Sequence, residues 1–111
     1  MSMSSYSRND IVLVRVPFSD FTGAKVRPVV VVNGPHRSRD LIAVGLTSRI
    51  SGLLQGEFVL ADWARSGLNV ASAAKRALFT IEQSLPLKYV GTLSAADSQT
   101  LDASLKLWLG V

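Results

Sequence analysis

The feature that most constrains the fold is a run of four valines, Val29 to Val32, preceded by Arg27 and Pro28. An unbroken β-branched run predicts a strand buried on both faces, because a strand with one wet face alternates apolar and polar side chains. Proline has no amide hydrogen to donate and tolerates the first position of a strand. We therefore expect sheet pairing to begin at Pro28 and Arg27 to lie at the rim of the sheet.

A second segment repeats this design. The residues from Leu41 to Leu46 are mostly apolar, and they give way abruptly to Thr47, Ser48 and Arg49. If the two strands pair, two guanidinium groups and two hydroxyl groups converge at one edge of the sheet. That edge is the predicted functional site.

Composition narrows the class of protein. A chain of 111 residues predicts one domain with a single core. The absence of cysteine excludes disulfides and thiolate metal sites, and a single histidine leaves little for a zinc site; we expect no metal and no cofactor. The net charge of +4 favours an anionic partner, although ordinary surface charge explains it equally well.

The N-terminus gives no sign of a membrane segment. The first nine residues are rich in serine and have no apolar core, and the longest apolar run falls far short of a bilayer span. We expect neither a signal peptide nor a membrane anchor. Residues 1–8 are predicted to form a flexible tail and residues 9–111 a single domain.

Shorter patterns predict the remaining elements. Strands are expected over residues 10–16, 56–60, 68–71 and 77–81. The last two are expected to be separated by the stretch 72–76, whose alanines also allow a helix. Asp62 is expected to cap a helical turn that ends near Gly67. The loop from Phe18 to Ala24 carries two aromatic residues, Phe18 and Phe21, which either stack on a nucleobase or tuck under the loop.

The C-terminal segment predicts one amphipathic helix over residues 95–109. Ser94 followed by Asp97 is typical of a helix start, because the serine oxygen accepts an amide hydrogen bond and the acid lies at the positive end of the helix. Leu101, Leu105 and Trp108 recur at helical spacing. Five to seven short strands closed by one helix predict a mainly β (α+β) fold built on a small, strongly bent sheet or barrel.

These segments together resemble a known family. The order DIVLVRVPFSDFTGAKVRPVVVV, LIAVGLTSR, LFTIEQSL and a helix that starts at GTLS is similar to the PemK/MazF family of type II toxin-antitoxin endoribonuclease toxins, over residues 9–109. The most specific part is the Arg-Pro-Val strand followed about twenty residues later by an apolar residue, Thr and Ser. The resemblance implies an SH3-like barrel with a helix and a homodimer. The absence of cysteine fits a reducing cytosol, so we expect a cytoplasmic protein. The resemblance also implies metal-free cleavage of single-stranded RNA at short motifs, to cyclic phosphate and 5′-hydroxyl ends, and inhibition by a cognate antitoxin.

By this resemblance Arg27 and Thr47 take the catalytic positions, with Ser48 as an accessory donor. A guanidinium donates two hydrogen bonds and charge to phosphate oxygens, and a threonine hydroxyl adds a neutral donor. Structural roles remain open for both, since a rim arginine also forms salt bridges and a threonine at a strand end also satisfies loop amides. The expected RNA-contacting residues are Phe18, Phe21, Lys25, Arg37, Arg39, Arg49, Lys75 and Arg76.

The chain departs from the family pattern before LFTI. Many relatives carry an Arg-x-Asp-like element there, whereas this chain has Ala74, Lys75 and Arg76. The general acid and base are therefore unassigned, and Lys75 and Arg76 are expected to contact phosphate. A non-catalytic family member that binds RNA or an antitoxin is one alternative. Another is a gyrase poison like CcdB, which shares the barrel and ends in Trp-Gly-apolar, because this chain ends Trp108-Leu-Gly-Val; Trp108 is also explained as a core anchor of the helix.

Overall fold

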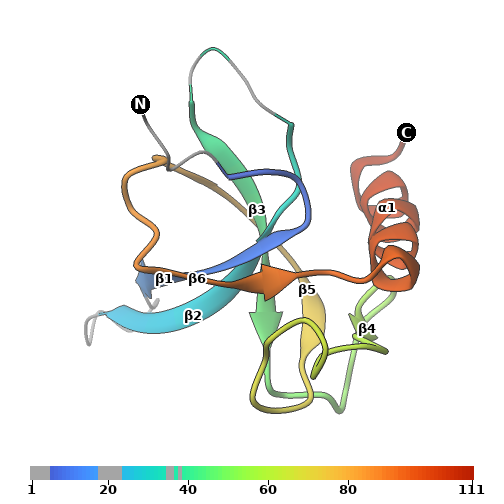
Figure 1. Cartoon of the computed structure of the whole chain (residues 1–111). Coiled ribbons are helices and arrows are strands. Elements are labelled where there is room, and N and C mark those ends of the chain that lie inside the picture. Colours follow the sequence, from blue (N-terminus) through green and yellow to red (C-terminus); the bar gives the residue numbers. More distant parts are fainter. Residues whose placement is uncertain (1–5, 18–23, 35–36, 38) are drawn as a thin grey trace.

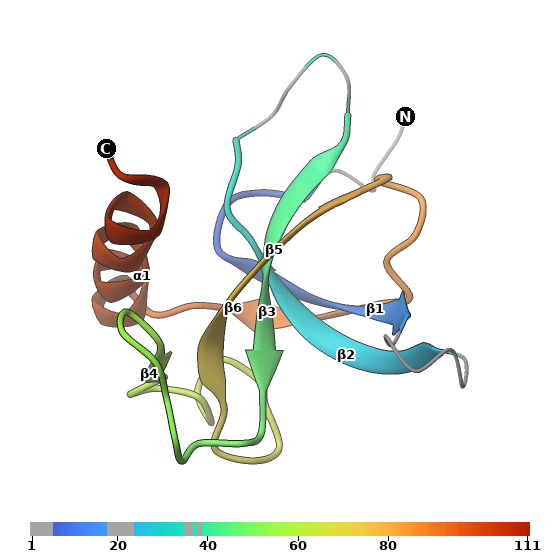
Figure 2. The same ribbon diagram turned by 180° about the vertical axis from the view of Figure 1, so that it is seen from behind.

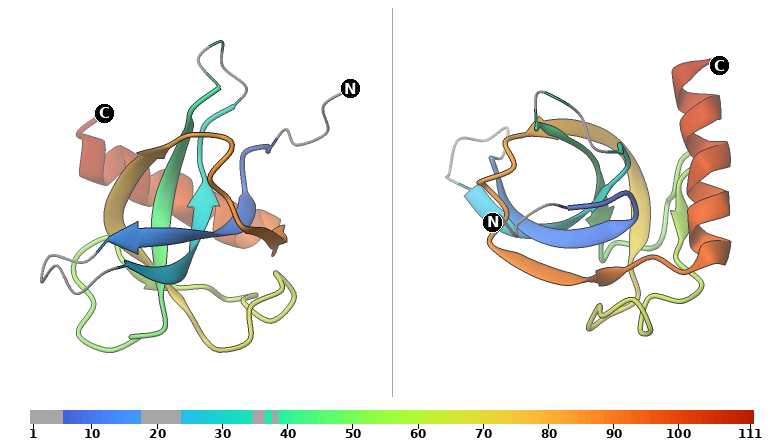
Figure 3. Two further views of the ribbon diagram at one scale, coloured as in Figure 1. Left: turned by 90° about the vertical axis from the view of Figure 1, so that its left-hand side faces the viewer. Right: turned by 45° about the horizontal axis from the view of Figure 1, so that its top comes forward.

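The computed structural model describes residues 6–17, 24–34, 37 and 39–111. Within them the chain forms six strands and one helix: β1 (Asp10–Pro17), β2 (Ala24–Val31), β3 (Leu41–Thr47), β4 (Phe58–Val59), β5 (Ala73–Ile81), β6 (Lys88–Thr92) and α1 (Ala95–Leu109). The strands form one antiparallel sheet in the order β4-β5-β3-β2-β1-β6. The sheet curls strongly, and α1 lies outside the curl on one side (Figures 1 and 3). The predicted mainly β fold with one terminal helix is confirmed.

The C-terminal part of β2, Val29 to Val31, is buried on both faces, as the valine run predicted. Val30 is fully buried in the cluster that contains Leu101 of α1. Its neighbour Val29 belongs to a second cluster with Val12 and Ala43. Successive residues of a strand point to opposite faces, so the two clusters lie on the two sides of the curled sheet.

The prediction that sheet pairing begins at Pro28 is correct on one side of β2 only. The ladder with β3 runs from Val31↔Ala43 to Val29↔Gly45 and stops beside Pro28. The ladder with β1 continues past Leu13↔Pro28 to Ala24, so the prediction is wrong on that side. The N–H and C=O of a strand residue face the same neighbour, and a proline therefore interrupts only the ladder that it faces.

The middle of the chain departs from the predicted strands. Strand β5 runs without a break from Ala73 to Ile81, so the predicted interruption at residues 72–76 is wrong, and residues 68–71 form no strand. Ala73 and Ala74 are fully buried where β5 pairs with both β3 and β4. Their packing overrides the modest helix preference of alanine. Strand β4 is shorter than predicted, and β6 was not predicted.

The turn and the helix follow the sequence closely. The Ser66 amide donates to the Asp62 carbonyl over 3.0 Å in the predicted helical turn. Helix α1 spans the predicted residues and begins with the Asp97 amide donating to the Ser94 hydroxyl over 3.1 Å. Leu101 is buried in the core, and Leu105 and Trp108 pack against the same cluster. The predicted apolar face of the helix is therefore confirmed.

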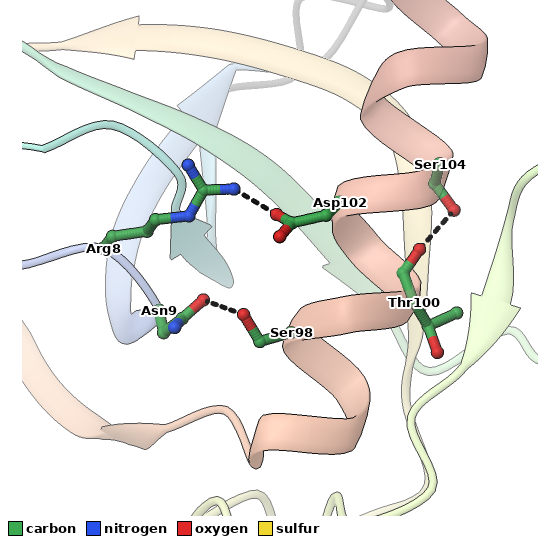
Figure 4. A network of polar contacts seen from close by, with 6 residues as sticks. All are labelled: Arg8, Asn9, Ser98, Thr100, Asp102 and Ser104. Carbon is green, nitrogen blue, oxygen red and sulfur yellow. Dashed lines mark hydrogen bonds and ion pairs between the residues drawn. The ribbon is translucent and has the colours of Figure 1, made fainter.

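The segment before β1 is attached to α1. Arg8 forms an ion pair with Asp102, and the Ser98 hydroxyl donates to the Asn9 side-chain oxygen over 3.0 Å (Figure 4). Tyr6 packs against the cluster that contains Val12. These contacts hold residues 6–9 against the domain, and the boundary at residue 9 stays a prediction. Among the helices of the described residues, none has the length and apolar character needed to cross a bilayer.

Candidate active site

Strands β2 and β3 separate at one end of the sheet, and a cleft opens between them. Their shared ladder stops at Val29↔Gly45. Beyond that pair β2 continues along β1, with Val14 opposite Arg27, while β3 continues along β5 as far as Thr47 (Figure 2). The resulting space, called the Thr47 cleft below, has a volume of about 220 Å³ and is lined by Arg27, Val29, Gly45, Leu46, Thr47, Lys75, Ala77 and Phe79.

Arg27 and Thr47 line this cleft together. Each lies two residues beyond the last β2–β3 pair, Val29 and Gly45, and side chains two residues apart on a strand share a face. Both side chains are half-buried, and Lys75 lies exposed on the β5 side. The structure therefore brings together three of the residues that the sequence singled out.

A bulge in β5 shapes the wall of the Thr47 cleft. Val44 pairs with Leu78 but Leu46 pairs with Ala74, so a step of two residues on β3 is matched by four on β5. Bulges bend a strand and redirect its side chains, and they are common beside active sites. Gly45 lies opposite the bulge, where a Cβ atom would come within 3.2 Å of the Phe79 ring. A glycine at this position keeps the cleft open.

The Thr47 hydroxyl also has a structural task. Its oxygen accepts a hydrogen bond from the Arg49 amide over 3.1 Å, which is the loop-capping role that strand-end threonines often take. A hydroxyl that accepts one hydrogen bond still has its own hydrogen to donate. The structural and the chemical role are therefore compatible at Thr47.

Arg27 also lines a second, larger cleft, on the other face of the strand ends. This cleft, called the Asn69 cleft below, has a volume of about 350 Å³ and is lined by Leu13, Arg27, Pro28, Leu46, Ser48, Gly67, Leu68, Asn69, Val70, Ser72, Lys88 and Val90. Ser48 lines it instead of the Thr47 cleft, because consecutive residues of an extended chain point to opposite sides. The two hydroxyls therefore line adjoining clefts, and Arg27 and Leu46 line both; a shared role of Thr47 and Ser48 in one site stays a prediction.

The other predicted RNA contacts divide into three groups. Lys25, Arg49 and Arg76 are exposed but line neither cleft. Arg37 and Arg39 are exposed in the segment before β3, at the opposite end of that strand from Thr47, about 20 Å away along the strand. The structure does not bring these two arginines to the site. Phe18 and Phe21 lie outside the described residues.

One carboxylate that the sequence analysis missed lies beside the basic pair of β5. Glu57 accepts hydrogen bonds from the Arg76 amide over 3.0 Å and from the Leu54 amide over 2.8 Å. These two bonds, the Arg76 bond most of all, and the nearby charges of Lys75 and Arg76 lower the pKa of Glu57 below its ordinary value of 4.5. Both carboxylate oxygens are engaged, so Glu57 ties the preceding loop to β5 and is not placed to accept a proton from a substrate.

Three further polar residues of the Asn69 cleft, Asn69, Ser72 and Lys88, were also missed. Lys88 opens β6, a strand that the sequence did not reveal, and Asn69 stands in a stretch predicted to be a strand. No motif marks any of them. Among the described residues, no three histidine, cysteine, aspartate or glutamate side chains gather into a group suited to a metal ion.

Comparisons with solved structures find the same fold elsewhere. An "Endoribonuclease from Mycobacterial species" matches with a TM-score of 0.78 and 15% identity, over 100% of this chain and 97% of that one. An "Endoribonuclease in complex with its cognate antitoxin from Mycobacterial species" matches with a TM-score of 0.78 and 16% identity, over 96% of each chain. The "Mycobacterium tuberculosis toxin MazF-mt6" matches with a TM-score of 0.66 and 18% identity, over 90% of this chain and 97% of that one. At these identities the likeness shows a shared fold.

Sequence comparison supplies the family. A search of curated proteins gives no match. The family model described as "PemK-like, MazF-like toxin of type II toxin-antitoxin system" matches residues 7–109, which include all six strands and the whole of α1. The chain therefore belongs to the PemK-like, MazF-like family of type II toxin-antitoxin toxins.

Proposed function

We propose that this toxin is an endoribonuclease that cleaves single-stranded RNA without a metal ion. The observation that carries the proposal is that Arg27, Thr47 and Lys75, from three different strands, line one cleft. Phosphodiester cleavage builds negative charge on the phosphoryl oxygens, and preorganised donors and cations lower its barrier. Two structural relatives are themselves named endoribonucleases, which supports the same class of reaction.

In the proposed reaction the ribose 2′-hydroxyl attacks the adjacent phosphorus. A bond forms between the 2′-oxygen and phosphorus as the 2′-hydroxyl gives its proton to solvent. The bond from phosphorus to the 5′-oxygen breaks, and the 5′-oxygen takes a proton from solvent, so the products carry a 2′,3′-cyclic phosphate and a 5′-hydroxyl. The nucleophile belongs to the RNA itself, so the step needs no metal-activated water. Arg27 binds the phosphoryl oxygens in bidentate fashion, and the Thr47 hydroxyl donates to one of them.

Arg27 is assigned to charge stabilisation. A guanidinium stays protonated in proteins and does not serve as a base. Lys75 adds a second cation to the lining of the same cleft, from strand β5. None of the described residues that line this cleft carries a carboxylate or an imidazole, which is why transition-state stabilisation bears most of the proposed catalysis.

The test is cleavage of single-stranded RNA by the pure protein in excess EDTA. We expect cleavage to persist, and Arg27→Ala to lower it by a factor of about 100 to 1,000, the usual effect of losing one transition-state donor. Arg65→Ala is the matched control, because Arg65 is exposed and lines neither cleft. Absence of cleavage by the wild-type protein, or equal cleavage by the Arg27→Ala variant, would contradict the proposal.

The proposal extends to partners and location. An antitoxin with a disordered acidic segment would cover the clefts, because Arg27, Lys75 and Lys88 give them positive charge.

A homodimer is proposed because large apolar side chains such as Leu85, Leu87 and Tyr89 are more than half exposed, and closed symmetric pairing buries such surface. The proposed location is the cytoplasm, where RNA is available. Light scattering on a sizing column measures the oligomeric state, and a mass of one chain would reject the dimer.

A further inference from the structure

We propose that the Asn69 cleft binds the nucleotide next to the scissile phosphate, and that Asn69 selects its base. The inference rests on the proposed function, because it takes single-stranded RNA as the ligand. It adds a specificity site to that function. The residues that carry it come from two segments far apart in sequence, the loop 67–72 and strand β6.

The first argument is continuity with the proposed catalytic cleft. Arg27 lines both clefts, and Thr47 and Ser48 are consecutive residues that line one cleft each. A phosphate held by Arg27 and Thr47 therefore lies at the boundary between the two clefts. The neighbouring nucleotide of the same strand then has a cavity of about 350 Å³ beside it, within the range of roughly 300–1,000 Å³ typical of small-ligand sites.

The second argument is the chemistry of the lining. Half of the twelve lining residues are apolar and can contact the flat face of a base: Leu13, Pro28, Leu46, Leu68, Val70 and Val90. Three polar side chains, Ser48, Asn69 and Lys88, are exposed at this cleft. Across the part of the chain that the structure describes, these three side chains form no hydrogen bond or ion pair. Their hydrogen-bonding groups are therefore available to a ligand.

Asn69 and Lys88 differ in what they can recognise. The carboxamide of Asn69 offers donors and an acceptor together, and such a group can pair with the edge of a base. The ammonium of Lys88 offers donors and charge alone, which suits a phosphate and carries no base preference. We therefore assign base selection to Asn69 and a flanking phosphate contact to Lys88.

The third argument is that the loop carrying Asn69 is held in place. At Gly67, whose φ is +95°, a Cβ atom would lie 2.5 Å from the Val90 carbonyl oxygen, and a Cβ at Gly91 would collide with the Ser66 carbonyl. The loop backbone therefore packs directly on β6. The turn that leads into this loop is held by Asp97 of α1, whose carboxylate accepts from the Ala61 amide over 2.8 Å and the Asp62 amide over 2.9 Å.

The end of the loop is tied as well. The Leu60 amide donates to the Ser72 carbonyl over 2.9 Å, and the Ser72 hydroxyl donates to the Val70 carbonyl over 3.0 Å. A wall fixed at both ends loses little conformational entropy when a ligand binds. Preorganised walls of this kind let a single side chain discriminate between bases.

The first test reads sequence preference. Wild type and Asn69→Ala are incubated with a random single-stranded RNA pool, and the ends of the fragments are sequenced. We expect Asn69→Ala to flatten the preference at one position beside the cut by roughly 5- to 100-fold, while the preference at the other positions is kept. Gln99→Ala is the control, because Gln99 is exposed on α1 and lines neither cleft. Unchanged preference at every position in Asn69→Ala would overturn the assignment.

Lys88→Ala serves as the companion variant, with Lys106→Ala on α1 as its matched lysine control. We expect Lys88→Ala to bind all single-stranded RNA sequences more weakly and to the same extent. The slope of the logarithm of the RNA association constant against the logarithm of the salt concentration should be shallower by about 0.7, the value for one lost phosphate contact on a single strand. A change in base preference in Lys88→Ala would contradict the division of roles.

The second test does not depend on cleavage. Isotope-labelled protein is titrated with AMP, GMP, CMP and UMP separately, and amide shifts are followed by NMR. We expect at least one nucleotide to shift residues 68–72 and 88–90 in wild type, and the shifts to be lost or reduced severalfold in Asn69→Ala. Shifts confined to other surfaces, or none with any nucleotide, would overturn the cleft as a nucleotide site.

The two tests separate the two proposals. Nucleotide-induced shifts in the Asn69 cleft without RNA cleavage would reject the nuclease and keep the cleft as a nucleotide site. Cleavage that depends on Arg27 but shows neither cleft shifts nor altered preference would keep the nuclease and reject the specificity site. Absence of both signals would reject both.

Discussion

Arg27 and Thr47 line the same cleft although they stand on strands that do not pair at that point. Each strand continues on its other neighbour, β2 on β1 and β3 on β5, so both residues are rigidly placed while the space between them stays open. Their separation is therefore set by where the β2–β3 ladder stops. Binding a phosphate requires fixed donor groups around an accessible space. The divergence of β2 and β3 supplies both the fixed groups and the space.

The hydroxyl of Thr47 is expected to matter for cleavage more than for folding. Thr47→Val keeps the shape and removes the donor, and we expect kcat/KM on a fluorogenic RNA to fall by about 10- to 100-fold, on the order of one lost transition-state hydrogen bond. Thr47→Ser retains the hydroxyl and should stay within about threefold of wild type. Wild-type activity in Thr47→Val would remove Thr47 from the proposed chemistry.

The neighbours Lys75 and Arg76 are expected to behave differently. Lys75 lines the Thr47 cleft and Arg76 does not, although both are exposed cations on β5. Lys75→Ala should lower cleavage by about tenfold or more through loss of charge beside the phosphate. Arg76→Ala should change it by less than about threefold, since charges outside the site are screened by salt. Equal effects of both substitutions in the same assay would show that only overall charge matters.

A side chain at Gly45 is expected to close the Thr47 cleft. Gly45→Ala places a methyl group 3.2 Å from the Phe79 ring, and we expect a loss of about 1 kcal/mol in unfolding free energy from overpacking. Cleavage should fall further than this modest destabilisation explains. Gly34→Ala is the control, because a Cβ at Gly34 meets nothing within 4 Å. Denaturant unfolding and RNA cleavage measured on the same preparations separate the two effects, and full activity in Gly45→Ala would refute the expectation.

Stability is expected to depend on pH through Glu57. The folded-state pKa of Glu57 lies below its ordinary value of 4.5, chiefly because the Arg76 and Leu54 amides donate to the carboxylate. Its contribution is therefore fully present above about pH 4.5 and is lost as the pH falls through the lowered folded pKa. In Tm measurements from pH 7 to pH 3, Glu57→Gln should start lower at pH 7 and approach wild type in acid. Parallel curves at all pH values would disprove the linkage.

Deleting Gly110 and Val111 tests the alternative of a tail-mediated poison. Trp108 is engaged in the fold, since its indole N–H donates to the Gln55 carbonyl over 3.0 Å and its ring packs on the core. Val111 is 86% exposed and Gly110 caps the helix. We expect the shortened chain to keep its RNA cleavage and its toxicity in cells. Loss of toxicity with cleavage intact would favour action through the tail.

Much of the fold was accessible from local patterns. The valine run predicted a strand covered on both sides, and Val29 and Val30 are buried in clusters on opposite faces. The pair Ser94 and Asp97 marked the start of α1, because capping depends on atoms three residues apart. Elements that depend on neighbours within a few residues can be predicted from sequence. Strand β6 and the full length of β5 could not be predicted, because their residues are held in the sheet by partners distant along the chain.

The sequence by itself determined that a guanidinium precedes one apolar strand, at Arg27, and that a hydroxyl follows another, at Thr47. The family resemblance assigned the catalytic positions to these two residues. Only the tertiary structure decided that both line one cleft, that Ser48 turns to the other, and that Lys75 joins them while Arg37 and Arg39 lie at the far end of β3. The reason is register: shifting a strand by one residue reverses the face of every side chain. Register is fixed by the sum of contacts along the whole ladder, including the bulge over Gly45, and not by the residues at the site.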